Sequence, residues 1–396
     1  VDSSKLLAYA VKGVMVWQDG RVAAQQQFPD RVLCAVWHPA GGEIAVCAGS
    51  RLWLWRPPSP PEAIAVLAGK VQAAQWRPQG RWLAAYDDTQ QIVLWDNRLR
   101  QMVGEPVADH AWATQMMAWS ADDDHLVTSA RGSVHVWSAS RGALVAEAEH
   151  GRRVGGLIFD TGTLSKTFLV WGQDGPVTRM SLEGTPLYTY TVAAAASSRH
   201  DLPFWDGDAR LMGTVDEGRN TVWNLATEPP LAQALDLEAT VVAAGWYSPY
   251  LATGDKDNRL HIWDTTPMAR GRPPQHVLEL FGHSRRADMD IVAVEWRHGA
   301  TAQLLSVSSD GSMRIWDVFD AEGRPLCADG DAGSAPLCSA HYHRAAYTVA
   351  PIRRAHWLGP DTVAALREDC VLVVWTMERP PQEYATPWQS GCDVAW

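Results

Sequence analysis

The stretch "SVSSDGSMRIWD", residues 306–317, places Asp310 six residues before Trp316, which ends a strand-like run. A histidine lies upstream at His283 in "FGHS". A serine, a histidine and an aspartate are the parts of a hydrolase triad, but they can also form a hydrogen-bonded brace inside a repeated unit. The rest of the chain distinguishes these two interpretations.

The spacing from aspartate to tryptophan recurs elsewhere in the chain. Asp257 precedes Trp263, and Asp369 precedes Trp375, by the same six residues. A catalytic aspartate has no reason to recur at a fixed distance from a tryptophan, whereas a buried polar network that must be satisfied in every unit has one. A G-x-S-x-G nucleophile motif is also absent. We therefore expect a structural brace and no catalytic triad.

Strand-like runs that end in tryptophan account for much of the unusual total of 21 tryptophans. One unit of this series is degenerate, with Met180 where the tryptophan should stand. The spacing of about 40 residues is typical of a repeat architecture. The tryptophans that end these runs are Trp17, Trp55, Trp95, Trp137, Trp223, Trp263, Trp316 and Trp375.

A second aromatic series marks another strand upstream of each of these runs. A short apolar run lies between the two markers, and in several units another follows the second marker. Four short strands separated by turn residues, repeated about every 40–45 residues, indicate a β-propeller. The residues of the second series are Trp37, Trp76, Trp119, Phe159, Trp205, Trp246, Trp296, Trp357 and Trp396.

Over essentially its whole length the chain resembles the WD-repeat (WD40) family, most strongly at "DKDNRLHIWD" (255–264) and "SVSSDGSMRIWD" (306–317). The resemblance implies four-stranded antiparallel blades. It also implies a buried chain of a histidine, a serine or threonine of the second strand, a turn aspartate and the third-strand tryptophan. In this sequence the complete set would be His283, Ser308, Asp310 and Trp316, with partial sets at Asp257–Trp263 and Asp369–Trp375.

Nine third strands predict nine blades in one domain, residues 1–396. Residues 5–17 lack a first strand and "GCDVAW" (391–396) is a first strand with nothing after it, so we expect these segments to share a blade and remove a sheet edge. The alternative is a ring of seven or eight blades followed by the start of a second propeller. Residues 318–350 are expected to form an insertion loop and a candidate binding element.

Composition limits the classes of function. The net charge of −11 makes nucleic-acid binding unlikely, and no apolar run is long enough for a membrane span. Cys34 and Cys47 fall in strand-like runs and are expected to be buried free thiols, which favours an intracellular, cytoplasmic location. The chain starts at Val1, which suggests part of a longer chain or larger complex. No cofactor or metal site is predicted, since His341 and His343 have no further ligands at suitable spacing.

Basic residues concentrate in the connections between one unit and the next, which the family fold gathers on one face. Arginine and aromatic side chains are favoured anchors at protein interfaces. The candidate partner-binding residues are Arg31, Lys70, Trp112, Arg152, Arg153, Arg199, Arg285, Arg286, Arg353 and Arg354.

The sequence therefore predicts a non-catalytic WD-repeat scaffold that binds other protein subunits or peptide segments in a multi-subunit assembly. One alternative is a module that reads an acidic or modified peptide on this face. Another is a factor in vacuolar proton pump assembly, because the strand motifs weakly resemble the rabconnectin family. A propeller fold alone does not choose between these functions.

Overall fold

The chain was analysed as a computed structural model. It describes residues 5–18, 21–104, 107–108, 116–120, 124–150, 154–159, 166–172, 177–190, 204–205, 211–216, 219–227, 231–284, 290–297, 302–320, 323–326, 337–339, 342–359, 361–377, 379–385 and 393–395.

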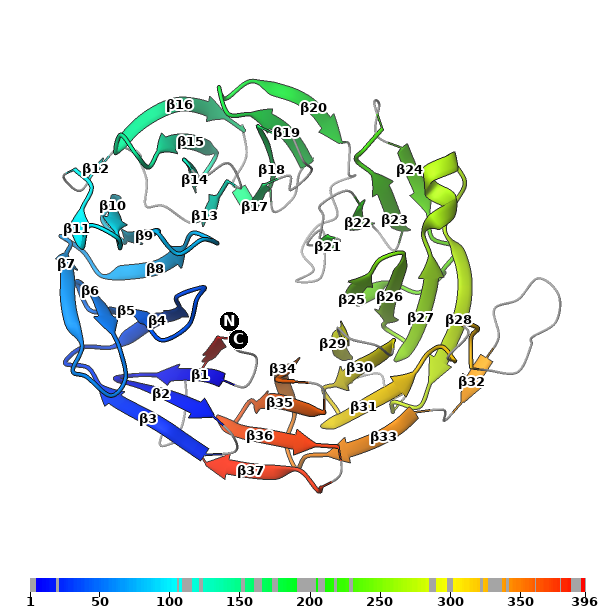
Figure 1. The fold of residues 1–396 in the computed structure, drawn as a ribbon. Helices are drawn as coiled ribbons and strands as arrows, with labels where there is room; N and C mark the ends of the chain where they lie inside the picture. Colours follow the sequence, from blue (N-terminus) through cyan, green and yellow to red (C-terminus); the bar gives the residue numbers. More distant parts are fainter. Residues whose placement is uncertain are drawn as a thin grey trace. The chain divides into compact units, whose positions relative to one another are not determined.

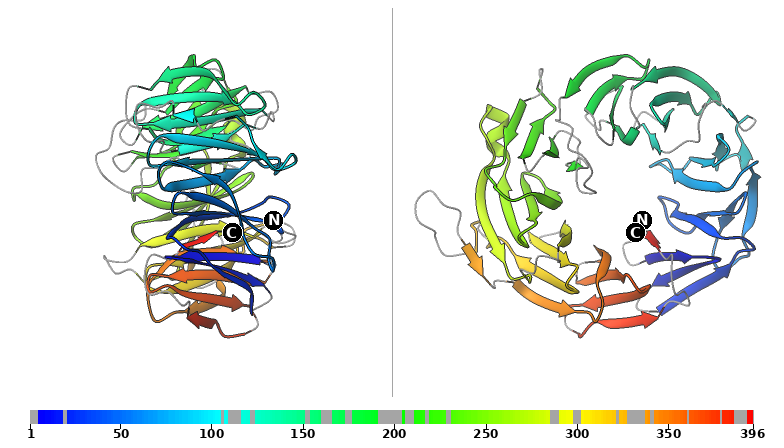
Figure 2. Two further views of the ribbon diagram at one scale, coloured as in Figure 1. Left: turned by 90° about the vertical axis from the view of Figure 1, so that its left-hand side faces the viewer. Right: turned by 180° about the vertical axis from the view of Figure 1, so that it is seen from behind.

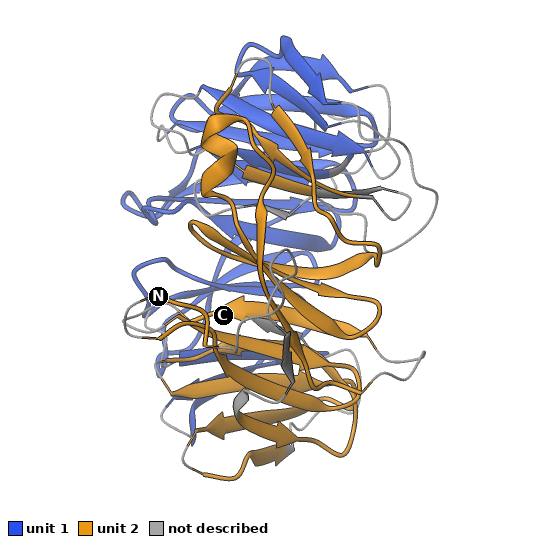
Figure 3. Ribbon diagram, turned by 90° about the vertical axis from the view of Figure 1, so that its right-hand side faces the viewer, with its two compact units in different colours: residues 1–192, 388–396 blue, residues 193–387 orange. Residues whose placement is uncertain are grey.

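The described strands form nine sheets, each built around four antiparallel strands. The chain divides into two compact units, shown in Figure 3. Unit 1 comprises Val1–Val192 and Trp388–Trp396, and unit 2 comprises Ala193–Pro387. Each unit is described by itself below.

Unit 1 holds five sheets. Their strands are β1 (Lys5–Ala10), β2 (Gly13–Gln18), β3 (Arg21–Gln27) and β38 (Asp393–Ala395); β4 (Val32–Trp37), β5 (Ile44–Ala48), β6 (Arg51–Trp55) and β7 (Glu62–Val66); β8 (Val71–Trp76), β9 (Trp82–Asp87), β10 (Gln91–Asp96), β11 (Gln101–Met102) and β12 (Val107–Ala108); β13 (Met116–Trp119), β14 (His125–Ala130), β15 (Ser133–Ser138) and β16 (Ala143–Glu149); and β17 (Val154–Phe159), β18 (Thr167–Gly172), β19 (Val177–Ser181) and β20 (Pro186–Tyr190).

Unit 2 holds four sheets and one short 3-10 helix, η1 (Thr266–Arg270). Its strands are β21 (Phe204–Trp205), β22 (Leu211–Asp216), β23 (Arg219–Asn224) and β24 (Leu231–Ala234); β25 (Val241–Tyr247), β26 (Tyr250–Asp255), β27 (Arg259–Asp264), β28 (Gln275–Phe281) and β32 (Leu337–Ser339); β29 (Ile291–Trp296), β30 (Gln303–Ser308), β31 (Ser312–Asp317) and β33 (Tyr342–Tyr347); and β34 (Ile352–Trp357), β35 (Thr362–Arg367), β36 (Val371–Thr376) and β37 (Gln382–Ala385).

The hydrophobic core of each unit lies between consecutive sheets. Cys47 and Leu52 of one sheet, for example, belong to the same buried cluster as Trp76 and Leu83 of the next. Second strands such as β5 and β9 are buried at every position, because both faces of the sheet are covered. The outer strand β16, by contrast, is exposed at most positions. This burial explains why the second and third strands are nearly continuous apolar runs.

The predicted count of nine four-stranded blades is confirmed. The predicted pairing of the chain's two ends is confirmed as well, since β38 takes the first-strand position of the first sheet and is antiparallel to β1 (Figure 1). In this ladder Leu7 lies opposite Ala395 and Tyr9 lies opposite Asp393. The free edge of β1 is thereby covered.

The prediction of one insertion loop over residues 318–350 is wrong in part. Residues 342–347 form β33, the fourth strand of its own sheet, and pair with β31. Residues 337–339 form β32, which adds to the outer edge of β28 in the preceding sheet. Within 318–350, residues 342–347 therefore belong to the blade itself, because the fourth strand is needed to complete it.

In the described part of the chain, no helix has the length and hydropathy that crossing a bilayer requires.

Candidate functional site

The best-developed polar cluster lies inside the sheet of β29, β30, β31 and β33. The indole Nε1 of Trp316 donates to Ser306 Oγ at 2.8 Å, and Ser306 Oγ lies 2.6 Å from His283 Nε2. His283 Nδ1 lies 2.7 Å from Ser312 Oγ, which in turn donates to the carboxylate of Asp310. The five side chains therefore form one continuous chain of hydrogen bonds that starts at the indole and ends at a carboxylate.

Which group donates and which accepts in each of these hydrogen bonds follows from the groups at the two ends of the network. An indole N–H only donates and a carboxylate only accepts. Since Ser312 donates to Asp310, its oxygen accepts from the Nδ1–H of His283, and His283 Nε2 then accepts from the hydroxyl of Ser306. Burial, followed by the nearby Arg314, lowers the pKa of His283 to about 3, so the ring is neutral as this pattern requires.

Asp310 is ionised in the same pattern. Burial alone would raise the pKa of its carboxyl, but hydrogen bonds from the side chain and backbone of Ser312 and from the backbone of Ser284 hold that pKa below its ordinary value. One carboxylate oxygen accepts the backbone N–H of Ser284 at 3.2 Å, which ties the incoming connection to the turn.

The predicted serine is wrong by two residues. Ser306, and not Ser308, accepts the indole N–H of Trp316. Trp316 lies opposite Leu304 in the ladder, and its indole reaches the residue two positions farther along the second strand. Ser308 instead accepts the backbone N–H of Asp310 at 3.2 Å and so supports the turn. Its position is set by the turn and not by the tryptophan.

The same diagonal relationship identifies two further braces: one at Trp263, where only a partial set was predicted, and one at Trp137, where none was. Trp263 donates to Thr253 Oγ1 at 3.0 Å, and Trp137 donates to Thr128 Oγ1 at 2.8 Å. In both sheets a histidine of the third strand, two residues before the tryptophan, lies opposite the threonine. The sequence signal would have been the H-x-W tripeptide together with a threonine nine or ten residues before the tryptophan. The two histidines are His261 and His135.

The predicted partner of Trp263 also needs correction. Asp257 is exposed, and its backbone N–H donates to Asp255 Oδ1 at 2.9 Å. The buried carboxylate is Asp255, whose Oδ2 accepts from His261 Nε2 at 2.9 Å. Nδ1 of His261 lies 3.2 Å from Nε2 of His276, whose ring stacks on Trp263. Asp255 ends the second strand, so its side chain points inward, whereas Asp257 lies out in the turn.

The predicted set at Asp369 and Trp375 is not assembled either. Asp369 forms an ion pair with Arg367, which also binds Glu383 at 2.8 Å. Trp375 pairs with Val363 in the ladder, so a hydroxyl for its indole would have to come from position 365. That position is alanine, which has no hydroxyl. The carboxylate therefore neutralises a buried arginine instead of completing a brace.

The chain has a WD40 β-propeller fold. The C-terminal WD40 domain of Sif2 is similar in structure, with a TM-score of 0.55 and 16% identity, over 80% of this chain and 92% of that chain.

Curated relatives carry related repeats but differ in length from this propeller. The ribosome biogenesis protein YTM1 of Podospora anserina is 31% identical over 122 residues, 29% of this chain and 24% of that protein. The anaphase-promoting complex subunit cdc20 of Dictyostelium discoideum is 23% identical over 269 residues, 64% of this chain and 50% of that protein. The chain thus spans a quarter to a half of these relatives. No family model matches the chain, and the resemblance to rabconnectin gains no support from these proteins.

The braces of this propeller offer no open reaction centre. Ser306 is fully buried and uses its oxygen toward both Trp316 and His283. A nucleophile must reach a substrate, and a serine enclosed in this way has no path to one. Within the described ranges no group of three or more metal-ligating side chains is present. These residues hold blades together.

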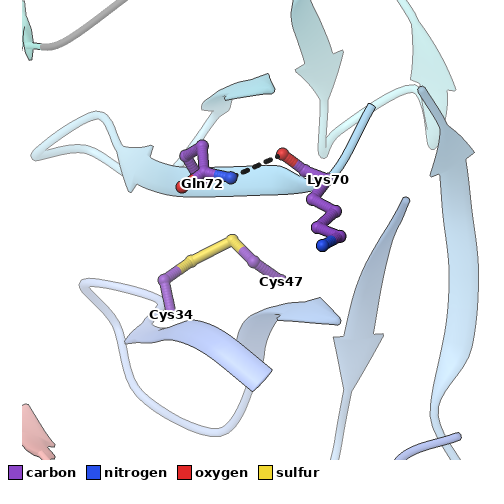
Figure 4. The surroundings of a disulfide bond; sticks show 4 residues. All are labelled: Cys34, Cys47, Lys70 and Gln72. Carbon is purple, nitrogen blue, oxygen red and sulfur yellow. Dashed lines mark hydrogen bonds between the residues drawn. A yellow bond between two sulfur atoms is a disulfide. The ribbon is translucent and has the colours of Figure 1, made fainter. Parts of the chain in front are cut away.

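The prediction that Cys34 and Cys47 are free thiols is wrong. They lie opposite each other in the ladder of β4 and β5 with a Cα–Cα distance of 5.0 Å, and they form a disulfide (Figure 4). Cys370 is disulfide-bonded as well. Cysteines that face each other on adjacent strands lie close enough to form a disulfide. The pattern of residues along a single strand does not show which residue of the next strand lies opposite. The argument for a reducing compartment therefore loses its basis.

The candidate partner-binding residues are only partly described. Arg31 and Lys70 are exposed and lie in the connections that lead into β4 and β8, as predicted; Figure 4 shows Lys70 beside Gln72, whose side chain donates to the Lys70 carbonyl. Arg353 and Arg354 are exposed but lie within β34, where the ladder has a bulge, and not in a loop. The others, Trp112, Arg152, Arg153, Arg199, Arg285 and Arg286, lie outside the described residues.

Proposed function

We propose that this propeller is a non-catalytic scaffold that binds other protein subunits through the connections between its blades. The observation that carries the proposal is that one group of polar side chains is buried in hydrogen-bonded braces and another is exposed in the connections between blades. Ser306 and His283 are buried and hydrogen-bonded in the brace around Trp316, whereas the cations Arg31 and Lys70 are exposed where the chain enters a new blade.

Acidic side chains at the same end of the sheets support this interpretation. Asp87 accepts the backbone N–H of Gly69 at 2.7 Å, and Asp88 accepts that of Lys70 at 2.7 Å. These carboxylates fix the connection through hydrogen bonds to its backbone; Asp87 is buried and Asp88 is exposed. A connection fixed before binding loses less conformational entropy when a partner docks, so its cation is a better anchor.

The names of two relatives agree with a role in assemblies. One relative is a subunit of the anaphase-promoting complex, and another is a ribosome biogenesis protein. Membership of this chain in a comparable assembly belongs to the proposal, as does an intracellular location.

The test is a charge reversal at the two exposed cations. The tagged protein would be purified from its own cells, and co-purifying proteins would be quantified for wild type, Arg31→Glu/Lys70→Glu and the matched control Arg98→Glu. Arg98 is exposed at the opposite end of its sheet, after β10. We expect the double variant to lose partners that the control keeps. Identical partner sets, or turnover of a substrate by the purified protein, would overturn the proposal.

A further inference from the structure

The outer edge of β28 carries an added strand that does not belong to its blade. Residues 337–339, β32, lie between β31 and β33 of the next sheet, yet they pair in parallel with Glu279, Leu280 and Phe281 of β28 (Figures 1 and 2). The chain thus leaves its own blade, joins the neighbour's edge and returns. The edge of β28 is therefore able to accept an extended segment.

The added strand is short. It forms three residue pairs with β28, whereas β27 and β28 are paired over six. A short ladder gains few hydrogen bonds, and ordering the connecting chain opposes it. β32 is therefore the part of this sheet that is most readily released.

The charge pattern of this edge differs from that of the matching edge in unit 1. With β32 in place, Glu279 is 9% exposed and Leu280 is buried. Glu279 binds Arg259 Nη1 at 2.7 Å, and Phe281 is uncharged. Glu279 lies opposite the third-strand histidine His261, and Glu147 of β16 lies opposite the third-strand histidine His135 in the same way. When the two strands are aligned on these pairs, β16 carries exposed Glu147 and, two residues later, exposed Glu149. Exposed charges discourage strand addition, and among the described residues no strand is added to β16.

We propose that the β28 edge over Glu279–Phe281 is a strand-addition site for an extended, uncharged segment of a partner protein, and that β32 covers it until such a segment replaces it. Main-chain hydrogen bonds supply the affinity in this binding mode. Because the β28 edge offers no unpaired charge to a charged side chain of the added strand, it favours an uncharged strand. Because β32 is tethered nearby, its high effective concentration weakens any competitor in the resting protein.

The experiment releases β32 and measures binding of a defined peptide. The released variant carries Leu337→Gly, Cys338→Pro and Ser339→Gly, since proline cannot donate to a ladder. The probe is a fluorescent peptide of residues 334–341 with serine at position 338, measured by anisotropy. We expect the released variant to bind it about tenfold or more tightly than wild type. A peptide with aspartate at position 338 should not bind.

The control restores the charge pattern of β16. Phe281→Glu in the released variant places a carboxylate at the position that Glu149 occupies in β16, and it should abolish peptide binding while the variant still unfolds cooperatively. Equal binding by wild type and released variant, both folded, would overturn the proposal. Dimers of the wild type that form by exchange of β32 would overturn it too, because the occupant would then be a second copy of this chain.

Discussion

Trp119 donates its indole N–H to the backbone carbonyl of Gln75 at 3.0 Å and so joins the first strands of two consecutive blades. Gln75 is the residue before Trp76, which ends the first strand of its own blade. The same bond joins Trp296 to Gly245 at 3.1 Å and Trp357 to Glu295 at 3.4 Å. These three first-strand tryptophans thus bind the preceding blade, whereas the third-strand tryptophans Trp137, Trp263 and Trp316 bind a hydroxyl within their own blade.

The carbonyl that accepts the indole N–H of Trp296 belongs to Gly245, and this position has no room for a side chain. A Cβ at Gly245 would lie 2.5 Å from the carbonyl oxygen of Val294, a backbone atom that cannot swing aside. We expect Gly245→Ala to force the two inner strands apart and lower the free energy of unfolding by about 1–3 kcal/mol. Denaturant unfolding followed by tryptophan fluorescence would measure this loss.

Gly359→Ala is the matched control in the same unit, since a Cβ there has no atom within 4 Å. It should leave the unfolding midpoint unchanged. If the two variants unfold alike, the close approach of β25 and β29 is not what position 245 protects.

Ser306 belongs to the brace around Trp316 and Ser308 does not, so replacing each by alanine should lower the free energy of unfolding by different amounts. Ser306→Ala leaves the indole N–H of Trp316 and Nε2 of His283 without their partner in a buried site, so we expect a loss of about 1–3 kcal/mol. Ser308→Ala removes one acceptor for a turn N–H, and we expect a smaller loss of about 0.5–1 kcal/mol. Parallel urea titrations of the two variants measure both losses, and a larger loss at Ser308 would restore the predicted set of His283, Ser308, Asp310 and Trp316.

How much of this could be predicted from the sequence depends on which interactions follow the repeat. The nine blades and the pairing of β38 with β1 followed from tryptophan spacing, because the spacing reflects strand lengths that the fold repeats. Ser306 and Asp255 did not follow from it, since they are selected by ladder register and by side-chain direction across two strands. β32 could not be predicted either, because it pairs with a blade that its own repeat does not include.

Acid should destabilise the protein through His283. The pKa of this histidine is about 3 in the folded state and about 6.5 when exposed. Between these values the unfolded chain binds a proton that the folded chain does not, so its contribution to stability is complete above pH 6.5 and falls as the pH drops toward 3. The slope should be about 1.4 kcal/mol per pH unit in that window.

The contribution of His283 can be separated by substitution. His283→Gln keeps polar atoms in place but cannot titrate, so the slope of unfolding free energy between pH 4 and 6 should decrease by about one proton. His276, whose pKa burial lowers to about 4, contributes in the same direction and remains in the variant as an internal reference. An unchanged slope in His283→Gln would show that the ring is already protonated in the folded protein.

A missing brace can be supplied where the register provides the place for it. The indole Nε1 of Trp55 is buried and has no hydrogen-bond partner among the described residues. Its ladder partner is Ile44, so the position that holds the hydroxyl in the braced blades is Val46, which is fully buried. Val46→Thr keeps the shape and places a hydroxyl beside the indole.

The hydroxyl introduced by Val46→Thr should be tolerated because Trp55 can donate to it, whereas without that donor it is an unsatisfied buried group. We expect Val46→Thr to be about 0.5–1.5 kcal/mol less destabilising in the presence of Trp55 than in a Trp55→Phe background. A double-mutant cycle from denaturant unfolding measures this coupling directly. Zero coupling would mean that register alone does not place the hydroxyl, and that the braced blades depend on the histidine beside the threonine or serine.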